Sequence, residues 1–181
     1  HNAATIAKSL SVDGKTIARY VDLFVDLLLV RRLEPWHKNV GKRLVKSPKL
    51  YIRDSGLAHC LLQIQDKELL LGNPIVGASW EGWVVENLIN LAPDGTGAYF
   101  YRTAAGAEAD LILCFPGGEI WPVEIKRGLS PKVERGFYNA CDDVGATKRF
   151  VVYSGIERYP VSENVEAIGI GEMAALVAAQ K

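Results

Sequence analysis

The chain has 181 residues, of which 49% are hydrophobic, and its 21 basic and 21 acidic residues give a formal net charge of zero. This length and composition suffice for one ordinary domain, or for a small domain followed by a larger one, and the overall charge points to no particular partner. The three cysteines are far apart and odd in number, which excludes a disulfide framework and a zinc-binding spacing and indicates a reducing, cytoplasmic compartment. No apolar run approaches the ~20 residues of a membrane span, so we expect no membrane partner.

The N-terminal segment begins with two helical patterns. Ala3–Leu10 is a short one, a turn containing glycine follows, and Lys15–Val30 has apolar residues at helical spacing. Two helices joined by such a turn are the outline of a helix-turn-helix. Leu29–Trp36 and Arg43–Arg53 then read as the two strands of a hairpin, which would be the wing of a winged helix.

The predicted hairpin is rich in positive charge. Eight of the 21 basic residues lie between Arg31 and Arg53, against Glu34 as the single acid. Such a hairpin could hold nucleic-acid phosphates, with Lys42, Arg43 and Lys46 as the candidate contacts. A solvated hairpin between two domains is an equally good interpretation.

A domain boundary follows the hairpin. Asp54-Ser55-Gly56 ends the second strand, Leu57–Gln65 is predicted to be helical, and Asp66–Pro74 reads as a loop. We place a winged-helix domain at residues 1–58 and a second, α/β domain at residues 59–181.

The most regular helix is predicted over Gly77–Ala92. At 100° per residue its apolar arc comprises Trp80, Val84, Leu88 and Leu91, widened by Trp83, Val85 and Ile89. Glu81 falls within this arc, whereas Glu86 falls on the polar side. Because a carboxylate among apolar side chains is costly unless it is paired or metal-bound, Glu81 is the first functional candidate and Glu86 the second. The alternative for Glu81 is a structural ion pair with a base such as Arg102.

A β-hairpin is predicted after a short strand at Tyr99–Arg102. Its strands are Glu108–Phe115 and Glu119–Lys126, joined by Pro116-Gly117-Gly118. A three-residue loop pairs Phe115 with Glu119, and the further apolar pairs are Leu113 with Trp121, Leu111 with Val123, and Ala109 with Ile125, all on one buried face. A two-residue slip would keep the same faces and stays open.

On the other face this register places Asp110 opposite Glu124 and Glu108 opposite Lys126. Like charges directly opposed destabilise a sheet, so the two acids call for a divalent cation between them, and hard cations take oxygen ligands. Lys126 points toward the same place. A solvated polar face with Lys126 as the counter-charge is the alternative.

The remaining elements complete an α/β pattern. We predict a helix from Lys132 to Asp142, a buried strand at Arg149–Tyr153, a strand at Val165–Ile170 and a closing helix at Glu172–Gln180. From Gly77 the order is helix, three strands, helix, two strands and helix.

This order resembles the PD-(D/E)xK nuclease-like superfamily. Glu81 lies on the helix, Asp110 on a following strand and Glu124-Ile125-Lys126 on the next strand. The resemblance covers Gly77–Ser154. It implies a restriction-endonuclease-like fold, in which helices flank a mixed sheet.

Six runs carry a closer resemblance, over nearly the whole chain: Ser47–Leu57, Trp80-Glu81, Glu86–Leu88, Tyr101–Thr103, Glu108–Asp110 and Val123–Lys126. They are similar to the domain of unknown function that follows an AAA-type ATPase module in bacterial and archaeal ATPases, where a winged helix links the two. The chain has no phosphate loop, so the ATPase module would lie outside it. The chain also lacks an initiating Met, which suggests a C-terminal fragment.

Carried over residue by residue, the resemblance implies a nuclease site. Asp110 and Glu124 would be metal ligands, Glu81 would complete the site, and Lys126 would be the catalytic lysine. The cofactor would be Mg²⁺ or Mn²⁺, the substrate a DNA phosphodiester, and Arg102 would join the hairpin bases in positioning the phosphate backbone. Ala109 stands where the superfamily name puts proline.

Two other classes of function fit the same residues. The chain could be a non-catalytic module of the ATPase that binds DNA or a partner protein without cutting. It could also be a pure protein-interaction domain.

Overall fold

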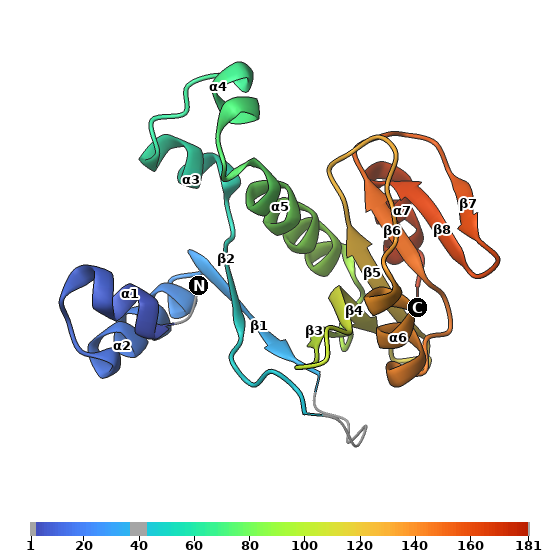
Figure 1. The fold of residues 1–181 in the computed structure, drawn as a ribbon, viewed down its shortest axis with the longest axis horizontal. Coiled ribbons are helices and arrows are strands. Elements are labelled where there is room, and N and C mark those ends of the chain that lie inside the picture. Colours follow the sequence, from blue (N-terminus) through green and yellow to red (C-terminus); the bar gives the residue numbers. More distant parts are fainter. Residues whose placement is uncertain (1–2, 37–42, 181) are drawn as a thin grey trace.

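The computed structural model describes residues 3–36 and 43–180. Its helices are α1 (Ala3–Leu10), α2 (Gly14–Asp26), α3 (Ser55–Leu61), α4 (Lys67–Gly72), α5 (Val76–Leu91), α6 (Arg135–Val144) and α7 (Ile170–Ala178). Its strands are β1 (Val30–Pro35), β2 (Lys49–Ile52), β3 (Gly97–Arg102), β4 (Glu108–Cys114), β5 (Ile120–Ile125), β6 (Phe150–Tyr153), β7 (Tyr159–Ser162) and β8 (Val165–Gly169). Figure 1 shows how they follow one another.

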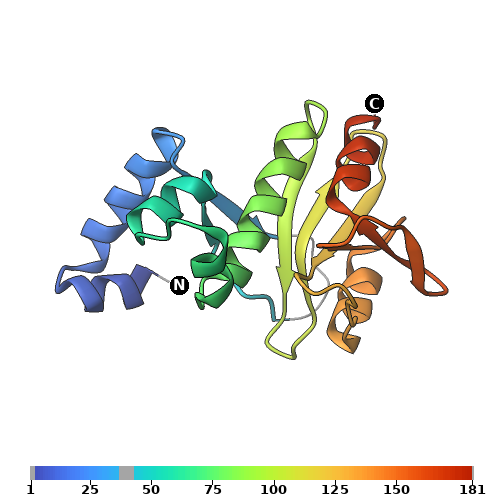
Figure 2. The ribbon, with the colours of Figure 1, turned by 90° about the horizontal axis from the view of Figure 1, so that it is seen from above.

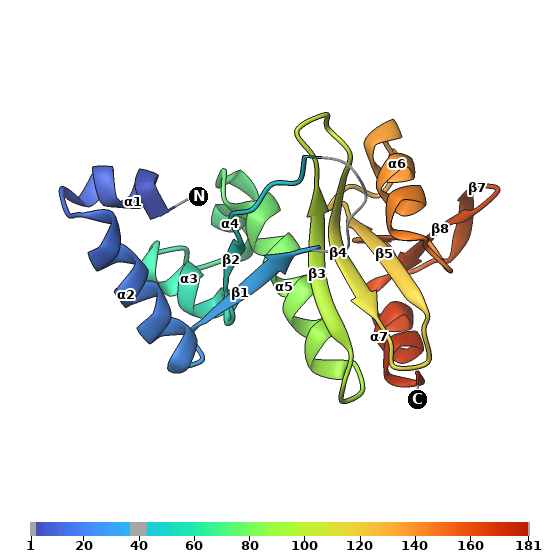
Figure 3. The same ribbon diagram turned by 90° about the horizontal axis from the view of Figure 1, so that it is seen from below.

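Across the described residues, eight strands form one sheet in the order β2-β1-β3-β4-β5-β6-β8-β7. The sheet is mixed, because β1–β3, β5–β6 and β6–β8 are parallel pairs and the others are antiparallel. Helices α5 and α7 lie on one face and α6 on the other (Figure 3). The predicted α/β class with a mixed sheet flanked by helices is confirmed.

Each face of the sheet has its own apolar core. On the α5 and α7 side, Leu88 and Met173 pack over Leu111 and Trp121, all fully buried. On the α6 side the core includes Phe137, Cys141, Ile112 and Tyr101. The central strands are therefore buried on both faces, so most of their residues are apolar rather than alternating with polar ones.

The central hairpin has the predicted register. Leu113 pairs with Trp121 and Leu111 with Val123, and the Phe115 amide donates to the Glu119 carbonyl at 2.9 Å. The loop needs a left-handed residue, which is Gly118 with φ +86°. This excludes the two-residue slip.

The N-terminal segment joins the same sheet. Strands β1 and β2 form the predicted antiparallel hairpin, with Val30 opposite Ile52, but β1 also runs parallel to β3. The prediction of one continuous strand over Arg43–Arg53 is wrong, because only Lys49–Ile52 pairs with β1, whereas Leu44 bridges to Thr103. Helices α1 and α2 lie beyond this edge of the sheet (Figure 2). The restriction-endonuclease-like and winged-helix identities stay predictions.

Two short elements depart from the sequence-based expectation. Helix α4 occupies part of the predicted loop, because Asp66 caps it by accepting the Leu69 amide at 2.8 Å. Strand β7 was not predicted; it is a four-residue edge strand containing Pro160, which gives little alternating signal. None of the helices in the described ranges combines the length and apolarity that a membrane crossing requires.

Candidate functional site

An ammonium lies among three carboxylates where β2, α5 and β4 meet. Lys49 Nζ is 3.1 Å from Glu81 Oε1, 3.1 Å from Asp110 Oδ1 and 3.6 Å from Glu108 Oε1. Burial alone would lower the pKa of Lys49, but the charges of Asp110 and Glu81 outweigh it and hold that pKa above its ordinary value. Lys49 therefore stays charged and neutralises part of this acidic cluster.

Tyr51, two residues along the same strand, reaches the same helix. Its hydroxyl donates to Glu81 Oε1 at 2.5 Å. The approach is possible because the next helical residue is Gly82, where an added Cβ would lie 3.2 Å from the Tyr51 ring. Burial and the charge of Glu81 raise the pKa of Tyr51, so the phenol remains a hydrogen-bond donor. Glu81 is thus held by two residues of β2.

A β-bulge orients Asp110. Tyr99 pairs with Ile112, but Tyr101 pairs with Ala109, so β4 carries one extra residue at this point. The parity of the strand changes there. The prediction that Ala109 shares the face of Leu111 is wrong, because Ala109 packs in the α6-side core.

Beyond the bulge, the hairpin ladder ends at Leu111 and Val123. The predicted pairs of Asp110 with Glu124 and Glu108 with Lys126 are therefore not part of the backbone register. Instead, Asp110 Oδ2 accepts the Ile125 amide at 3.0 Å, while Oδ1 faces Lys49. Burial and the charge of Glu81 raise the pKa of Asp110, although Lys49 acts in the opposite direction.

Glu124 and Lys126 form the other half of the site on β5. Lys126 Nζ lies 2.8 Å from Glu124 Oε1, whereas the buried Glu124 Oε2 has no hydrogen-bond partner among the described residues. Burial, followed by the neighbouring charge of Asp110, raises the pKa of Glu124 to about 7. Lys126 thus satisfies one oxygen of Glu124, while Lys49 is shared among Asp110, Glu81 and Glu108, so the four acids outnumber the two lysines.

These residues fit a hard divalent cation through two carboxylates. Asp110 and Glu124 offer oxygen donors of the type that Mg²⁺ and Mn²⁺ take, and the unpartnered Oε2 is a buried acceptor. Within the described ranges, however, no three His, Cys, Asp or Glu side chains are gathered closely enough to hold a metal. Glu81 is held by Lys49 and Tyr51, so its role as a third ligand stays a prediction.

A cleft of about 660 Å³ opens beside this cluster. Lys49, Glu81, Glu108, Asp110 and Arg102 contribute its charged lining, and the rest comes from β2, α3, α5 and the residue before α5. Its volume and its charged lining make it the best place on the described residues for a polar ligand.

Of the predicted phosphate contacts in the described residues, Arg102 lines this cleft, whereas Arg43 and Lys46 do not. The Arg102 side chain is 54% exposed and lies 3.4 Å from Glu108. The Arg43 carbonyl accepts the Ala104 amide at 3.1 Å, which brings that exposed residue to the end of β3. Lys46 is exposed on the segment between Arg43 and β2, and Lys42 lies outside the described residues.

A second charged cluster fastens the hairpin to α5. Glu86, 7% exposed, accepts Arg53 Nε at 2.6 Å and Arg31 Nη2 at 3.0 Å, and Asn90 also donates to it. Glu86 lies beside Asn90 on the polar side of the helix, as predicted, but the β1–β2 hairpin covers that side. Trp83 and Leu91, placed in the apolar arc, are instead 39% and 45% exposed.

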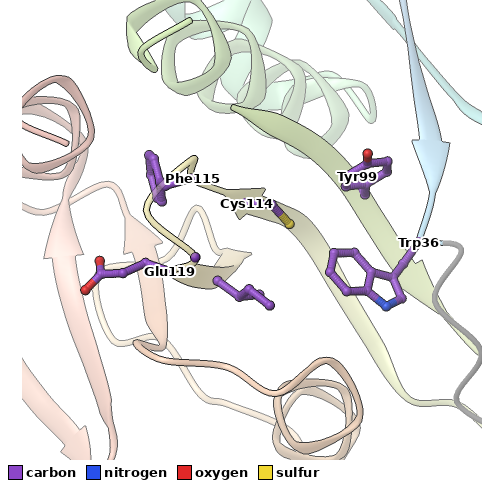
Figure 4. A pocket seen from close by; sticks show the side chains of 7 residues that line it. Trp36, Tyr99, Cys114, Phe115 and Glu119 are labelled. Carbon is purple, nitrogen blue, oxygen red and sulfur yellow. The ribbon is translucent and has the colours of Figure 1, made fainter. Parts of the chain in front are cut away.

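An aromatic hollow of about 300 Å³ lies near the tip of the central hairpin. Trp36 and Tyr99 meet edge to face there, with their ring centroids 5.5 Å apart, and Figure 4 shows Glu119 turned away from them. Glu119 accepts Trp121 Nε1 at 2.8 Å and lies 3.3 Å from Lys148. Because its acid is already paired, this hollow is a weaker candidate than the acidic cleft.

Sequence reasoning missed Lys49 and Tyr51. Both lie in the run Ser47–Leu57, which carries part of the family resemblance. Residues i and i+2 of a strand share a face, so their spacing would have placed the two side chains together. No local signal indicated that this face meets Glu81.

The fold and the site define an α/β domain whose mixed sheet bears an acidic cleft at the junction with an N-terminal hairpin. Residues 76–173, more than half of the chain, match the family described as Domain of unknown function (DUF4143), and the chain belongs to that family. Residues 1–68 match a second family, described as Domain of unknown function (DUF8612).

Two curated relatives are uncharacterized proteins of Mycobacterium tuberculosis and Mycobacterium bovis. Each is 44% identical over 168 residues, which is 92% of this chain and 37% of the relative. The chain thus spans little more than a third of the length of these relatives. No solved structure matches the chain significantly.

Proposed function

We propose that this chain carries a metal-dependent, nuclease-like domain that hydrolyses DNA phosphodiesters. The observation that carries the proposal is a pair of acids, the partly buried Asp110 and the buried Glu124, with an unpartnered Glu124 oxygen and with Lys126 beside it. Lys49 is shared among three acids and Lys126 leaves one oxygen of Glu124 without a partner, and a cation that belongs there explains best why these charges are retained.

In this proposal Asp110 and Glu124 hold the metal and Lys126 faces the reacting phosphate. When bound, Mg²⁺ or Mn²⁺ supplies Lewis-acid polarisation of a phosphoryl oxygen and a more acidic water. The Lys126 ammonium, which keeps its proton because Glu124 raises its pKa against the effect of burial, stabilises negative charge that develops on the phosphate. Arg102, at the exposed rim of the cleft, binds a flanking phosphate.

The resemblance to domains that follow AAA-type ATPase modules supports a place within a longer protein. The curated relatives have more than half of their length outside the matched region. We propose that the corresponding protein pairs this nuclease-like domain with an ATPase module, in the cytoplasm, and that the N-terminal helices and hairpin link the two.

A specific observation favours a second candidate function, a non-catalytic DNA- or protein-binding module. Lys49 already neutralises part of the acidic cluster from within the chain. A site that is closed by its own lysine could serve only to join the N-terminal hairpin to the sheet.

Cleavage of supercoiled plasmid and branched DNA in Mn²⁺ separates the two. The nuclease proposal predicts nicking that EDTA stops and that Asp110→Asn and Glu124→Gln each reduce at least a hundredfold. Asp94→Asn and Glu163→Gln, which make the same chemical changes at exposed positions, should cleave like the wild type. Salt-sensitive DNA binding without cleavage in any divalent ion would favour the second function.

A further inference from the structure

The acidic site is filled by a residue from a different part of the chain. Lys49 lies on β2, within the region that matches the DUF8612 family, whereas Glu81, Glu108 and Asp110 lie within the DUF4143 region. We propose that Lys49 is a built-in cation that competes with the divalent metal for Asp110, so that docking of the N-terminal hairpin closes the metal site. This inference rests on the proposed function and concerns the regulation of the same site.

The competition follows from the two oxygens of Asp110. Oδ2 already accepts the Ile125 amide at 3.0 Å, and Oδ1 is 3.1 Å from Lys49 Nζ. A metal ligated by Asp110 would therefore take the oxygen that Lys49 holds, whereas Glu124 keeps Oε2 free for a metal while Lys126 stays on Oε1. Metal ligation and the Lys49 contact exclude one another.

The unpartnered Glu124 oxygen indicates that Lys49 does not satisfy the whole site. Glu124 is 8% exposed, its Oε1 pairs with Lys126, and its Oε2 is buried without a hydrogen-bond partner among the described residues. Lys49 serves Glu81, Glu108 and Asp110 instead. With Lys49 in place, the free oxygen of Asp110 is occupied, whereas Glu124 keeps one oxygen without a partner beside Lys126.

Strand β2 and Arg53, the residue after it, contact α5 and β4 through polar side chains that share one face. Lys49 contacts Glu81 and Asp110, Tyr51 contacts Glu81, and Arg53 contacts Glu86. These three residues alternate along the chain and so share a face. The Tyr51 ring also packs against the α5-side core, but the other contacts are charged and hydrogen-bonded groups, which lose less on exposure to water than apolar ones because water can satisfy the separated partners.

The position of β2 in the sheet allows such a release. It lies at an edge and pairs with β1 alone, whereas β1 continues into the central sheet through β3. The cleft of about 660 Å³ lies directly against Lys49 and Tyr51. Displacing this edge strand exposes the acids without disturbing the central sheet.

Binding of Mn²⁺ to the purified 181-residue chain, followed by electron paramagnetic resonance, tests the inference. Lys49→Met should bind Mn²⁺ at least tenfold more tightly than the wild type, and Lys49→Arg, which keeps the charge, should bind as weakly as the wild type. Lys67→Met, which removes an exposed lysine of α4, is the matched control and should change nothing. Adding Asp110→Asn to Lys49→Met should abolish the gain.

Thermal unfolding in EDTA and in Mn²⁺ gives a second readout. Lys49→Met should melt at a lower temperature than the wild type in EDTA and regain stability in Mn²⁺, because the metal replaces the ammonium. If Lys49→Met does not fold in EDTA, the double variant Lys49→Met/Glu81→Gln replaces it, because this variant removes one charge of each sign.

Equal Mn²⁺ affinity in wild type and Lys49→Met overturns the inference and leaves the proposed nuclease standing if the wild type cleaves DNA. Absence of Mn²⁺ binding in both overturns the metal site itself.

Discussion

Glu86→Gln should lower the free energy of unfolding by about 2 kcal/mol. Removing one partner of a buried ion pair typically costs about 3–5 kcal/mol, because the remaining charge is left without compensation. Here the side chains of Arg31 and Arg53 keep 20% and 26% of their surface exposed, so water solvates part of their charge and reduces the loss. The amide of Gln keeps the volume, which leaves the packing of α5 unchanged.

Urea unfolding at pH 7 measures this effect, with Glu163→Gln as an exposed control that should differ from the wild type by less than about 0.5 kcal/mol. A lower midpoint at an unchanged denaturant slope is the expected result. If Glu86→Gln falls within the range of the control, the Arg31–Glu86–Arg53 cluster does not hold the hairpin against α5 and the reasoning is refuted.

The same variant has a predicted pH signature. Burial would raise the pKa of Glu86, but hydrogen bonds from Arg31, Arg53 and Asn90 outweigh it and hold the pKa below its ordinary value of 4.5. A depressed pKa in the folded state contributes stability above the unfolded pKa, which is lost as the pH falls through the folded value. The difference between wild type and Glu86→Gln should therefore be full at pH 7 and shrink below about pH 4.5. A difference that stays constant down to pH 3 would contradict this assignment.

Three further substitutions test separate parts of the fold by the same unfolding assay. Tyr51→Phe removes a donor to a carboxylate and should cost about 1.5 kcal/mol; no loss would mean that the 2.5 Å contact with Glu81 carries no stability. Leu88→Ala in the fully buried α5-side core should cost about 2–5 kcal/mol, and a cost below 1 kcal/mol would contradict its central packing. Gly118→Ala should cost about 1–2 kcal/mol because φ is +86°, whereas a neutral effect would argue against the left-handed turn.

The parts of the fold that sequence predicted are those that local pattern determines. The turn Pro116-Gly117-Gly118 and the alternating strands around it fix the hairpin register, and the apolar spacing in Gly77–Ala92 locates α5 to within a residue. The bulge at Asp110 was not predictable in this way, because it depends on how β3 and β4 pair rather than on either strand alone.

The candidate site was predicted only in part, for a similar reason. Asp110, Glu124 and Lys126 lie on one hairpin, so its two strands bring them to the same end, although the bulge removes the predicted pairing of Asp110 with Glu124. Lys49 and Tyr51 reach Glu81 from a strand 30 residues away in sequence, and nothing local distinguishes Lys49 from the other basic residues of its segment. Long-range partner choice for a polar side chain depends on tertiary packing, which a single sequence does not display.

An anomalous difference map from a crystal of the Lys49→Met chain soaked in Mn²⁺ would show whether Asp110 and Glu124 share one cation. We expect one peak at ligand distance, roughly 2.0–2.3 Å, from carboxylate oxygens of both Asp110 and Glu124. A map without density between these two side chains, at a Mn²⁺ concentration that saturates an ordinary carboxylate site, would contradict it.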